Sequence, residues 1–116
     1  MPITILSQSA TISDLQDLGD LASSLSAIPC RTRDLPVDLE GAGGSSMGVW
    51  ECTPGQSRRQ VAGAEVMHIL TGACSFTPEG GEPREIRAGD TLFFPANTRG
   101  IWNIQETLRK VYVIFS

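Results

Sequence analysis

The stretch AGDTLFFPANTRGIWN, from Ala88 to Asn103, decides the fold because it encloses a short apolar run between turn residues. Gly89 and Asp90 are turn formers, and the run Thr91–Phe94 follows them directly. Pro95 then ends the run, since a proline has no N–H to donate to a neighbouring strand. This order predicts a short strand that is bounded on both sides by changes of chain direction.

The same rhythm of apolar runs and turn residues continues through the second half of the chain. The candidate strands are Gly48–Cys52, Glu65–Leu70, Ala73–Thr77, Arg84–Ile86, Thr91–Phe94, Arg99–Ile104 and Leu108–Phe115. Short strands at intervals of about 8–12 residues indicate a β-sandwich or a barrel. No helical pattern alternates with them, so a parallel α/β sheet is disfavoured.

The chain has 116 residues, which fits one domain in two unlike parts. Residues 48–116 contain the predicted strands. Residues 1–47 are expected to form an N-terminal extension that packs on the strands or on a dimer partner. The glycine-rich stretch Glu40–Ser46 separates the two parts.

The N-terminal part gives weaker patterns. Ile3–Leu6 is a candidate edge strand. Ser13–Leu25 has leucines at helical spacing behind a capping box, which predicts a helix. Arg31–Leu39 is expected to be extended or irregular, because the residue before Pro36 is restricted to extended conformations.

Charge and composition exclude several classes of partner. The net charge is −4, without a basic stripe, a polybasic run or an apolar run of ~20 residues. Neither nucleic acid nor a membrane is therefore an expected partner. The N-terminus lacks the basic and apolar regions of a signal peptide, which predicts a cytoplasmic protein. Cys30, Cys52 and Cys74 form no CxxC pair, which predicts reduced, partly buried thiols and no zinc knuckle.

Alternation along the strands divides the side chains between two faces. Glu65 and Met67 share one face, and His68 lies on the opposite one as a packed or interface residue. Lys110 and Tyr112 share a face of the last strand, and the other face is apolar. Both faces of that strand are therefore expected to be covered.

Two segments resemble the conserved motifs of the cupins. The first is Pro54–Gly72, PGQSRRQVAGAEVMHILTG, which contains a Glu, six residues and a Gly, as the first cupin motif does. The second is AGDTLFFPANTRGIWN, which contains a Gly, five residues and a Pro, as the second cupin motif does. GVWECTPG and RKVYVIF are also similar to single-domain cupins related to (S)-ureidoglycine aminohydrolase and to the ethanolamine-utilisation cupins. The resemblance covers Gly48 to Phe115. It implies a double-stranded β-helix, or jelly-roll barrel, and a homodimer.

The resemblance also implies where a cupin metal would be held, and there the sequence departs from the family. A typical metal cupin has an HxH pair before the Glu of the first motif and a histidine in the second motif. The HxH pair corresponds to Arg58 and Gln60 or to Arg59 and Val61, and the later slot corresponds to Gly100. Three of the four usual ligands are missing, so no cofactor is expected, and a divalent metal is the minor alternative.

Glu65 is the candidate catalytic residue and the one weak candidate for a metal ligand. By its position in the cupin motif it points into the barrel. A buried carboxylate is costly unless it is paired or protonated. Its expected partner is Arg58, Arg59 or Lys110, the only lysine of the chain. Two interpretations stay open: a buried structural ion pair, or a polar pocket for a small ligand.

Aromatic residues accompany this site. Trp102 shares strand parity with Gly100 and is expected to project inward, as a core residue or as the wall of a pocket. Phe93 and Phe94 point to opposite sides, so one is expected inside the barrel and the other under the N-terminal segment. The expected ligand pocket comprises Arg58, Arg59, Glu65, Met67, Trp102, Lys110 and Tyr112.

Three functions fit this sequence. We favour a small cupin that binds an unidentified small molecule in the barrel beside a degenerate metal site. An alternative is an enzyme for a ureido or amino-acid-derived substrate, in which Glu65 polarises the substrate or takes a proton. A structural or regulatory homodimer is the third. Serine-triad, P-loop and dinucleotide-binding motifs are absent from the sequence.

Overall fold

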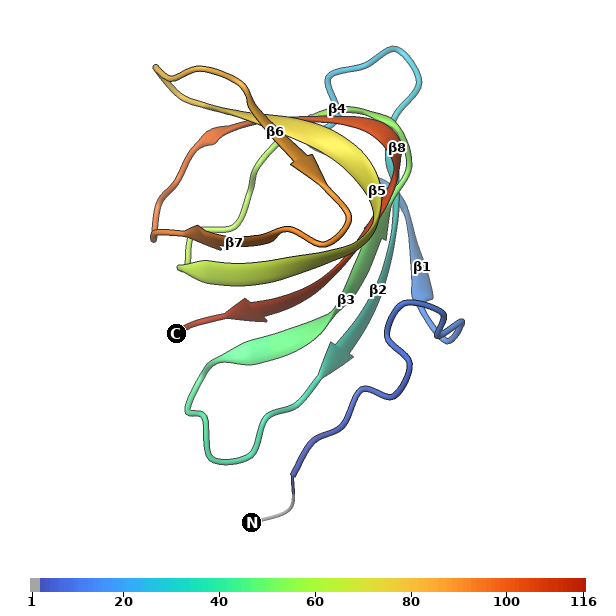
Figure 1. The fold of residues 1–116 in the computed structure, drawn as a ribbon, viewed down its shortest axis with the longest axis vertical. Coiled ribbons are helices and arrows are strands. Elements are labelled where there is room, and N and C mark those ends of the chain that lie inside the picture. The colour runs from blue at the N-terminus through green and yellow to red at the C-terminus, as the bar shows by residue number, and fades with distance from the viewer. Residues whose placement is uncertain (1–2) are drawn as a thin grey trace.

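The computed structural model describes residues 3–116, which form one bent antiparallel sheet without a helix (Figure 1). Its strands are β1 (Gln16–Asp20), β2 (Arg31–Val37), β3 (Ser46–Cys52), β4 (Gly55–Arg58), β5 (Glu65–Pro78), β6 (Arg84–Arg87), β7 (Thr91–Phe94) and β8 (Gly100–Ile114). They are ordered β1-β2-β3-β8-β5-β6, with β4 paired to β8 and β7 paired to β5. The all-β jelly-roll architecture expected from the sequence is confirmed. Within residues 3–116, no helix is long and apolar enough to span a membrane.

The two longest strands, β5 and β8, hold the barrel together because each has different partners along its two halves. β8 pairs with β4 in its first half and with β3 from Leu108 onwards. β5 pairs with β7 near Glu65 and with β6 from Ala73 onwards. The register between β5 and β8 shifts at several points from Ile69 to Cys74, and such bulges bend a sheet at that place.

Gly72 marks a difference between the predicted and the observed strands. The sequence predicts a turn there, but β5 runs through it, and β8 likewise joins two predicted strands. Gly72 has a φ of +94°, and a Cβ atom at this position would overlap the backbone of Thr107 on β8. The glycine therefore serves the close approach of two strands instead of a chain reversal.

The N-terminal predictions are wrong in two places. The segment 13–25 contains β1 instead of a helix, since Gly19 adopts a φ of +75° and its N–H donates to Asp17 Oδ1 at 2.7 Å. Such local side-chain bonds compete with helix formation. Leu18 is 53% exposed, so the spaced leucines form no buried helical face. The segment 3–6 is not a strand, and its isoleucines are exposed.

The first part of the chain continues the barrel sheet through β1 and β2. β2 pairs with β3 from Thr32 to Val37 and places Asp34 beside Trp50. The segment before β1 lies against the outer side of the sheet, where Arg109 donates hydrogen bonds to the carbonyl oxygens of Ser9 and Ile12. The predicted boundary between residues 47 and 48 lies within β3.

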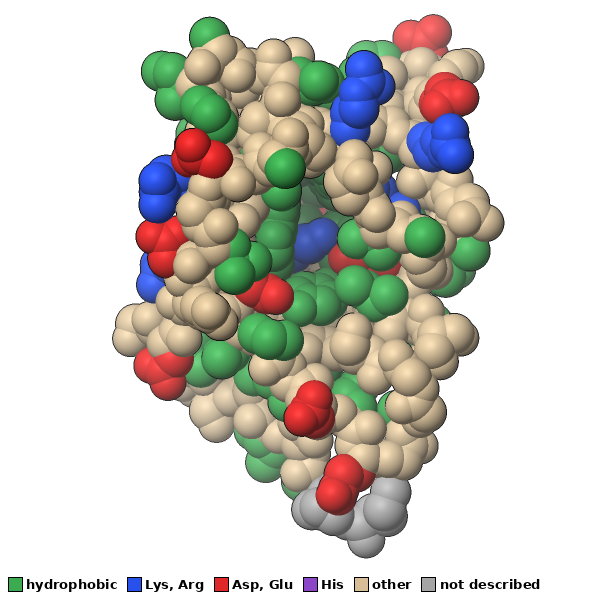
Figure 2. Space-filling view, turned by 180° about the vertical axis from the view of Figure 1, so that it is seen from behind, with side chains coloured by type: hydrophobic (Ala, Val, Ile, Leu, Met, Phe, Trp, Pro, Cys, Tyr) green, Lys and Arg blue, Asp and Glu red, His purple; other side chains and the backbone are tan. Residues whose placement is uncertain are grey.

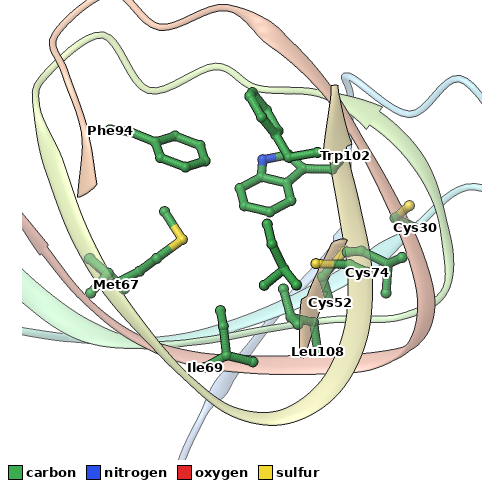
Figure 3. Close-up of a cluster of buried hydrophobic side chains, with 12 residues drawn as sticks. Cys30, Cys52, Met67, Ile69, Cys74, Phe94, Trp102 and Leu108 are labelled. Carbon is green, nitrogen blue, oxygen red and sulfur yellow. The ribbon is translucent and has the colours of Figure 1, made fainter. Parts of the chain in front are cut away.

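The core fills the interior of the barrel, where side chains from β3, β5, β6, β7 and β8 meet (Figure 3). Its fully buried members include Cys30, Cys52, Met67, Ile69, Cys74 and Leu108. The three cysteines are free thiols. Burial raises the pKa of Cys74 to about 11, so this thiol stays protonated at neutral pH.

The two phenylalanines of β7 separate as their alternation predicts, but only one is covered. Phe94 is buried in the core, whereas Phe93 is 59% exposed. The prediction that the N-terminal segment covers the second phenylalanine is wrong. That segment instead contacts the outer side near Arg109 on β8, and β5 separates β8 from β7.

Candidate functional site

Three charged side chains meet inside the barrel. Arg59 donates a hydrogen bond from Nη2 to Glu65 Oε1 at 2.9 Å. Lys110 donates from Nζ to the other carboxylate oxygen, Oε2, at 3.0 Å. The side chains of Arg59, Glu65 and Lys110 are 2%, 2% and 9% exposed. We call these three residues the charged triad.

The strands place the triad by alternation. Glu65 begins β5 and Lys110 lies on β8, and both side chains point to the inner side of the sheet. Arg59 directly follows β4, and its backbone N–H donates to the carbonyl oxygen of Gly100 at 3.0 Å. Its Nη1 also donates to the carbonyl oxygens of Val61 and Thr98. These bonds to the backbone fix the guanidinium independently of Glu65.

The charges of the triad do not cancel. Two cations face one carboxylate in a region that is removed from water. Burial lowers the pKa of Lys110, and the nearby Arg59 lowers it further, while Glu65 opposes both effects. Such a site favours either an additional negative charge or a neutral lysine amine.

Aromatic rings enclose the triad. Lys110 Nζ lies 4.8 Å from the ring centroid of Trp50 and 5.5 Å from that of Trp102. The Arg59 guanidinium lies 4.7 Å from the ring centroid of Phe94, which stacks on Trp102. Cations over aromatic faces are stabilised by the negative potential of the ring. The rings therefore orient both cations while they exclude water.

A second carboxylate lies at the same site, on β2. Tyr112 donates a hydrogen bond from its hydroxyl to Asp34 Oδ1 at 3.0 Å. Burial raises the pKa of Asp34, and the bond from Tyr112 partly opposes this effect. Burial and the adjacent Asp34 also raise the pKa of Tyr112, so its hydroxyl stays a donor.

These groups line a cavity of about 250 Å³. Its lining residues are Leu21, Ser23, Asp34, Trp50, Ser57, Arg58, Arg59, Gln60, Val61, Glu65, Trp102, Lys110, Tyr112 and Ile114. Figure 2 shows a hollow on this side of the molecule with Lys or Arg atoms visible below its rim. Since a water molecule takes a share of roughly 30 Å³ in the liquid, the cavity has room for about eight to ten non-hydrogen atoms.

Two polar atoms of the cavity residues lack hydrogen-bond partners. Within the part of the chain that the structure describes, Arg59 Nε and Ser23 Oγ are buried without a partner. No other side-chain nitrogen or oxygen in that part is in this state. Unpaired buried donors cost free energy, so native proteins place them where another group can pair with them.

A larger cleft of about 620 Å³ adjoins the cavity. It runs between the turn 77–81 and the segment 97–101 and shares Arg58 and Arg59 with the cavity. It contains neither Glu65 nor Lys110, and most of its lining belongs to exposed loops. The smaller cavity is therefore the candidate site.

The donor set of the cavity does not fit a metal cation. Both carboxylate oxygens of Glu65 are occupied by cationic groups, and a metal would lie beside two positive charges. Among residues 3–116, no group of three or more His, Cys, Asp or Glu side chains is placed to hold a metal. A Cβ atom at Gly100 would overlap Phe76 and the backbone of Thr77, so a histidine does not fit that slot.

The structure brings most of the predicted pocket together. Glu65, Trp102, Lys110 and Tyr112 line the cavity. Met67 lies in the core, where its sulfur is 3.8 Å from Lys110 Nζ. The further predicted pair, Arg58 and Arg59, both line the cavity, but Arg59 is buried in contact with Glu65 whereas Arg58 is exposed.

Four further cavity residues are absent from the predicted pocket: Leu21, Ser23, Asp34 and Trp50. Asp34 lies 78 residues from its partner Tyr112. The alternation of Thr32, Asp34 and Pro36 was the one available signal, because it places Asp34 on the inner face once β2 is recognised as a strand.

Asp34 predicts a pH-dependent stability. Its raised pKa means that folded Asp34 keeps its proton at a pH where the unfolded carboxyl, with its ordinary pKa of 3.8, has lost it. Stability therefore falls as the pH rises from that value through the raised pKa. We expect Asp34→Asn to remove this loss, so that the variant gains stability relative to the parent protein as the pH rises above the ordinary pKa of 3.8. Urea unfolding at several pH values measures the difference, and a constant difference contradicts the prediction.

The barrel and the two motifs define a cupin. The EutQ-like cupin domain matches residues 39–112, well over half of the chain, and the chain belongs to this family. No curated protein matches the chain. The family match supports the ethanolamine-utilisation side of the sequence resemblance, and the ureidoglycine aminohydrolase side stays a prediction.

Solved structures share the fold. A DUF861-family protein of unknown function from Pseudomonas syringae pv. tomato DC3000 is 22% identical with a TM-score of 0.77, over 89% of this chain and 45% of that one. A putative ethanolamine utilization protein Q from Salmonella typhimurium LT2 is 20% identical with a TM-score of 0.66, over 84% and 76%. A DUF861-family protein from Thermotoga maritima is 31% identical with a TM-score of 0.56, over 58% and 76%. The chain spans less than half of the length of the Pseudomonas protein.

Proposed function

We propose that this cupin binds a small carboxylate-bearing molecule in the barrel cavity, without a metal. The excess positive charge of the buried triad carries the proposal. Lys110 Nζ has three N–H groups, and its contacts with Glu65 and Met67 leave one for a ligand. Arg58 at the rim adds a further positive charge. The absence of a resident metal and the cytoplasmic location stay predictions.

Calorimetric titration with lactate and lactamide tests the proposal. The two probes have the same size, but only lactate carries a charge. A charge-assisted hydrogen bond stabilises by about 1.5–3 kcal/mol, so we expect lactate to bind at least about tenfold more tightly than lactamide. Protein treated with EDTA should bind equally well. Equal affinity for both probes, or no binding of lactate, contradicts the proposal.

A variant pair locates the binding. Lys110→Met should weaken lactate binding by about tenfold or more, because it removes the cation that faces the cavity. Arg84→Met serves as the control, since Arg84 is exposed on β6 and does not line the cavity. A similar effect of the two substitutions would mean that lactate binds through the general charge of the protein.

The enzyme alternative receives less support from the contacts. In the alternative of an enzyme for a ureido or amino-acid-derived substrate, Glu65 acts on the substrate directly, by polarising it or by taking a proton from it, which requires a carboxylate oxygen directed at the substrate. Both oxygens of Glu65 are bonded to cations. We therefore keep binding as the proposed function, with Glu65 as the group that holds the amine of Lys110 in place.

A homodimer is a second proposal, and the outer face of the sheet supports it. One cross-strand row on this face consists of Val37, Met47, Val113, Val66 and Phe93. These side chains are partly or largely exposed. His68 lies in the next row, where its Nδ1 is 2.7 Å from Thr91 Oγ1. A contiguous apolar row of this kind is typical of an interaction surface.

Sedimentation velocity tests the dimer. We expect the parent protein to sediment as a dimer at micromolar concentration. Val66→Lys should shift it to the monomer, because it places a charge within the apolar row, between Val113 and Phe93. Gln105→Lys, at an exposed position of β8 outside that row, should leave the dimer intact. A parent protein that sediments as a monomer contradicts the proposal.

A further inference from the structure

Lys110 has the surroundings of a reactive amine. It is the only lysine of the chain, and its side chain is 9% exposed at the wall of the cavity. Lysines with a solubility or surface-charge role are exposed, and a buried lysine is rare unless it is paired. Lys110 is paired, but it shares its carboxylate with Arg59.

The contacts of Lys110 match the two conditions that activate a lysine as a nucleophile. One condition is an apolar enclosure, which Trp50 and Trp102 provide. The other is a neighbouring cation, which disfavours the protonated amine. Arg59 supplies it, because it binds the same carboxylate as Lys110.

Glu65 gives the amine a local proton acceptor. Its Oε2 lies 3.0 Å from Lys110 Nζ, within the range for direct proton transfer. Arg59 keeps the carboxylate in place through Oε1. Two further groups at the site, Tyr112 and Asp34, bond to each other on the β2 side of the cavity. They leave the amine open to a ligand in the cavity.

We propose that Lys110 forms a reversible imine with a small 2-oxo acid or aldehyde acid bound in the cavity. The inference rests on the proposed carboxylate binding and adds a carbonyl group to the ligand. Glu65 takes one proton from the Lys110 ammonium group, and the amine nitrogen then attacks the carbonyl carbon. A second proton moves from the nitrogen to the carbonyl oxygen to give a carbinolamine. The carbon–oxygen bond then breaks and water leaves as the C=N bond forms. Glu65 returns its proton through the Lys110 nitrogen to the departing hydroxyl group, so both protons that the oxygen gains come from the lysine ammonium and no oxidant or reductant is needed.

Trapping with sodium borohydride in the presence of pyruvate tests the imine. Borohydride reduces an imine to a stable secondary amine, which adds one carboxyethyl group to the chain. The chain offers only Lys110 and its α-amino group as amines, so peptide mass spectrometry assigns the adduct without ambiguity. We expect the adduct on Lys110 with pyruvate and none with lactate, which lacks the carbonyl group.

Two variants make the test independent of folding defects. Lys110→Arg keeps the charge and removes the amine, and should lose the adduct. The second variant combines Lys110→Met with Arg84→Lys, which moves the only lysine to an exposed position of β6. We expect Lys110 to be trapped at least about tenfold faster than the lysine at the exposed position. Circular dichroism verifies that each variant is folded.

The outcomes separate this inference from the proposed function. An adduct confined to Lys110 supports the imine. Pyruvate that binds as lactate does, without any adduct, overturns the imine and leaves carboxylate binding in place. Trapping at equal rates at Lys110 and at the exposed lysine also overturns it, because the cavity then contributes no activation. A Lys110 adduct in a protein that binds no lactate supports the imine and contradicts carboxylate binding.

Discussion

Glu65→Gln is expected to lower the free energy of unfolding by about 3–5 kcal/mol, because removal of one partner of a buried ion pair leaves the others without a counter-charge. Here Arg59 and Lys110 both lose it. Urea unfolding measures the change. Glu82→Gln, at an exposed turn position, should change stability by less than about 0.5 kcal/mol. A loss below about 1 kcal/mol in Glu65→Gln contradicts the buried triad as described.

A triple variant distinguishes a structural triad from a functional one. Arg59→Met, Glu65→Leu and Lys110→Met together replace all three charges by apolar side chains of similar size. Buried ion pairs often tolerate such replacement with little loss of stability. We expect the triple variant to be more stable than Glu65→Gln, yet to bind no lactate. That outcome would show that the charges serve the ligand more than the fold.

Gly100→Ala is expected to lower the free energy of unfolding by about 3 kcal/mol, at the upper end of what overpacking costs. The added Cβ atom would overlap the ring of Phe76 and the carbonyl oxygen of Thr77. The ring can shift, but the oxygen belongs to the β5 backbone that pairs with β8. Urea unfolding again measures the loss.

Gly80→Ala is the matched control for that experiment. Gly80 has a φ of +76° and open space around its Cα atom, so alanine there costs only the backbone strain of about 1–2 kcal/mol. Phe76→Leu in the Gly100→Ala background should restore part of the stability, because it removes one of the two overlaps. If Gly100→Ala kept the full stability of the parent protein, β5 and β8 could move apart at Gly100 at little cost in free energy, which would contradict the prediction.

The sequence predicts the barrel strands well wherever turn residues bound them. Thr91–Phe94 lies between Gly89-Asp90 and Pro95, and it is a strand with the same limits. The turn predicted at Gly72 is wrong, because a glycine that allows two strands to approach closely cannot be distinguished from a turn glycine by the residues around it. The distinction depends on Thr107, which lies far along the chain.

The inward orientation of the predicted site residues is found where alternation along one strand suffices, while their role as a site stays a prediction. Glu65, Lys110 and Trp102 point inward as expected. Alternation alone does not decide which of Arg58 and Arg59 points inward, because the inner face of the segment at β4 is unknown until its register with β8 is known. Asp34 is missed because its place in the cavity depends on the pairing of β2 with β3. No local pattern in the N-terminal part of the sequence reveals that pairing.

β8 follows the other strands along the chain, and this has a consequence for how the protein folds during synthesis. β8 pairs with β3, β4 and β5, and it alone connects β3 and β5 in the sheet. A ribosome therefore releases β3, β4 and β5 before the partner that these three strands share emerges. Folding must wait for that last strand, as expected when contacts between distant segments dominate. During this interval the edges of β3 and β5 are open to pairing with other chains.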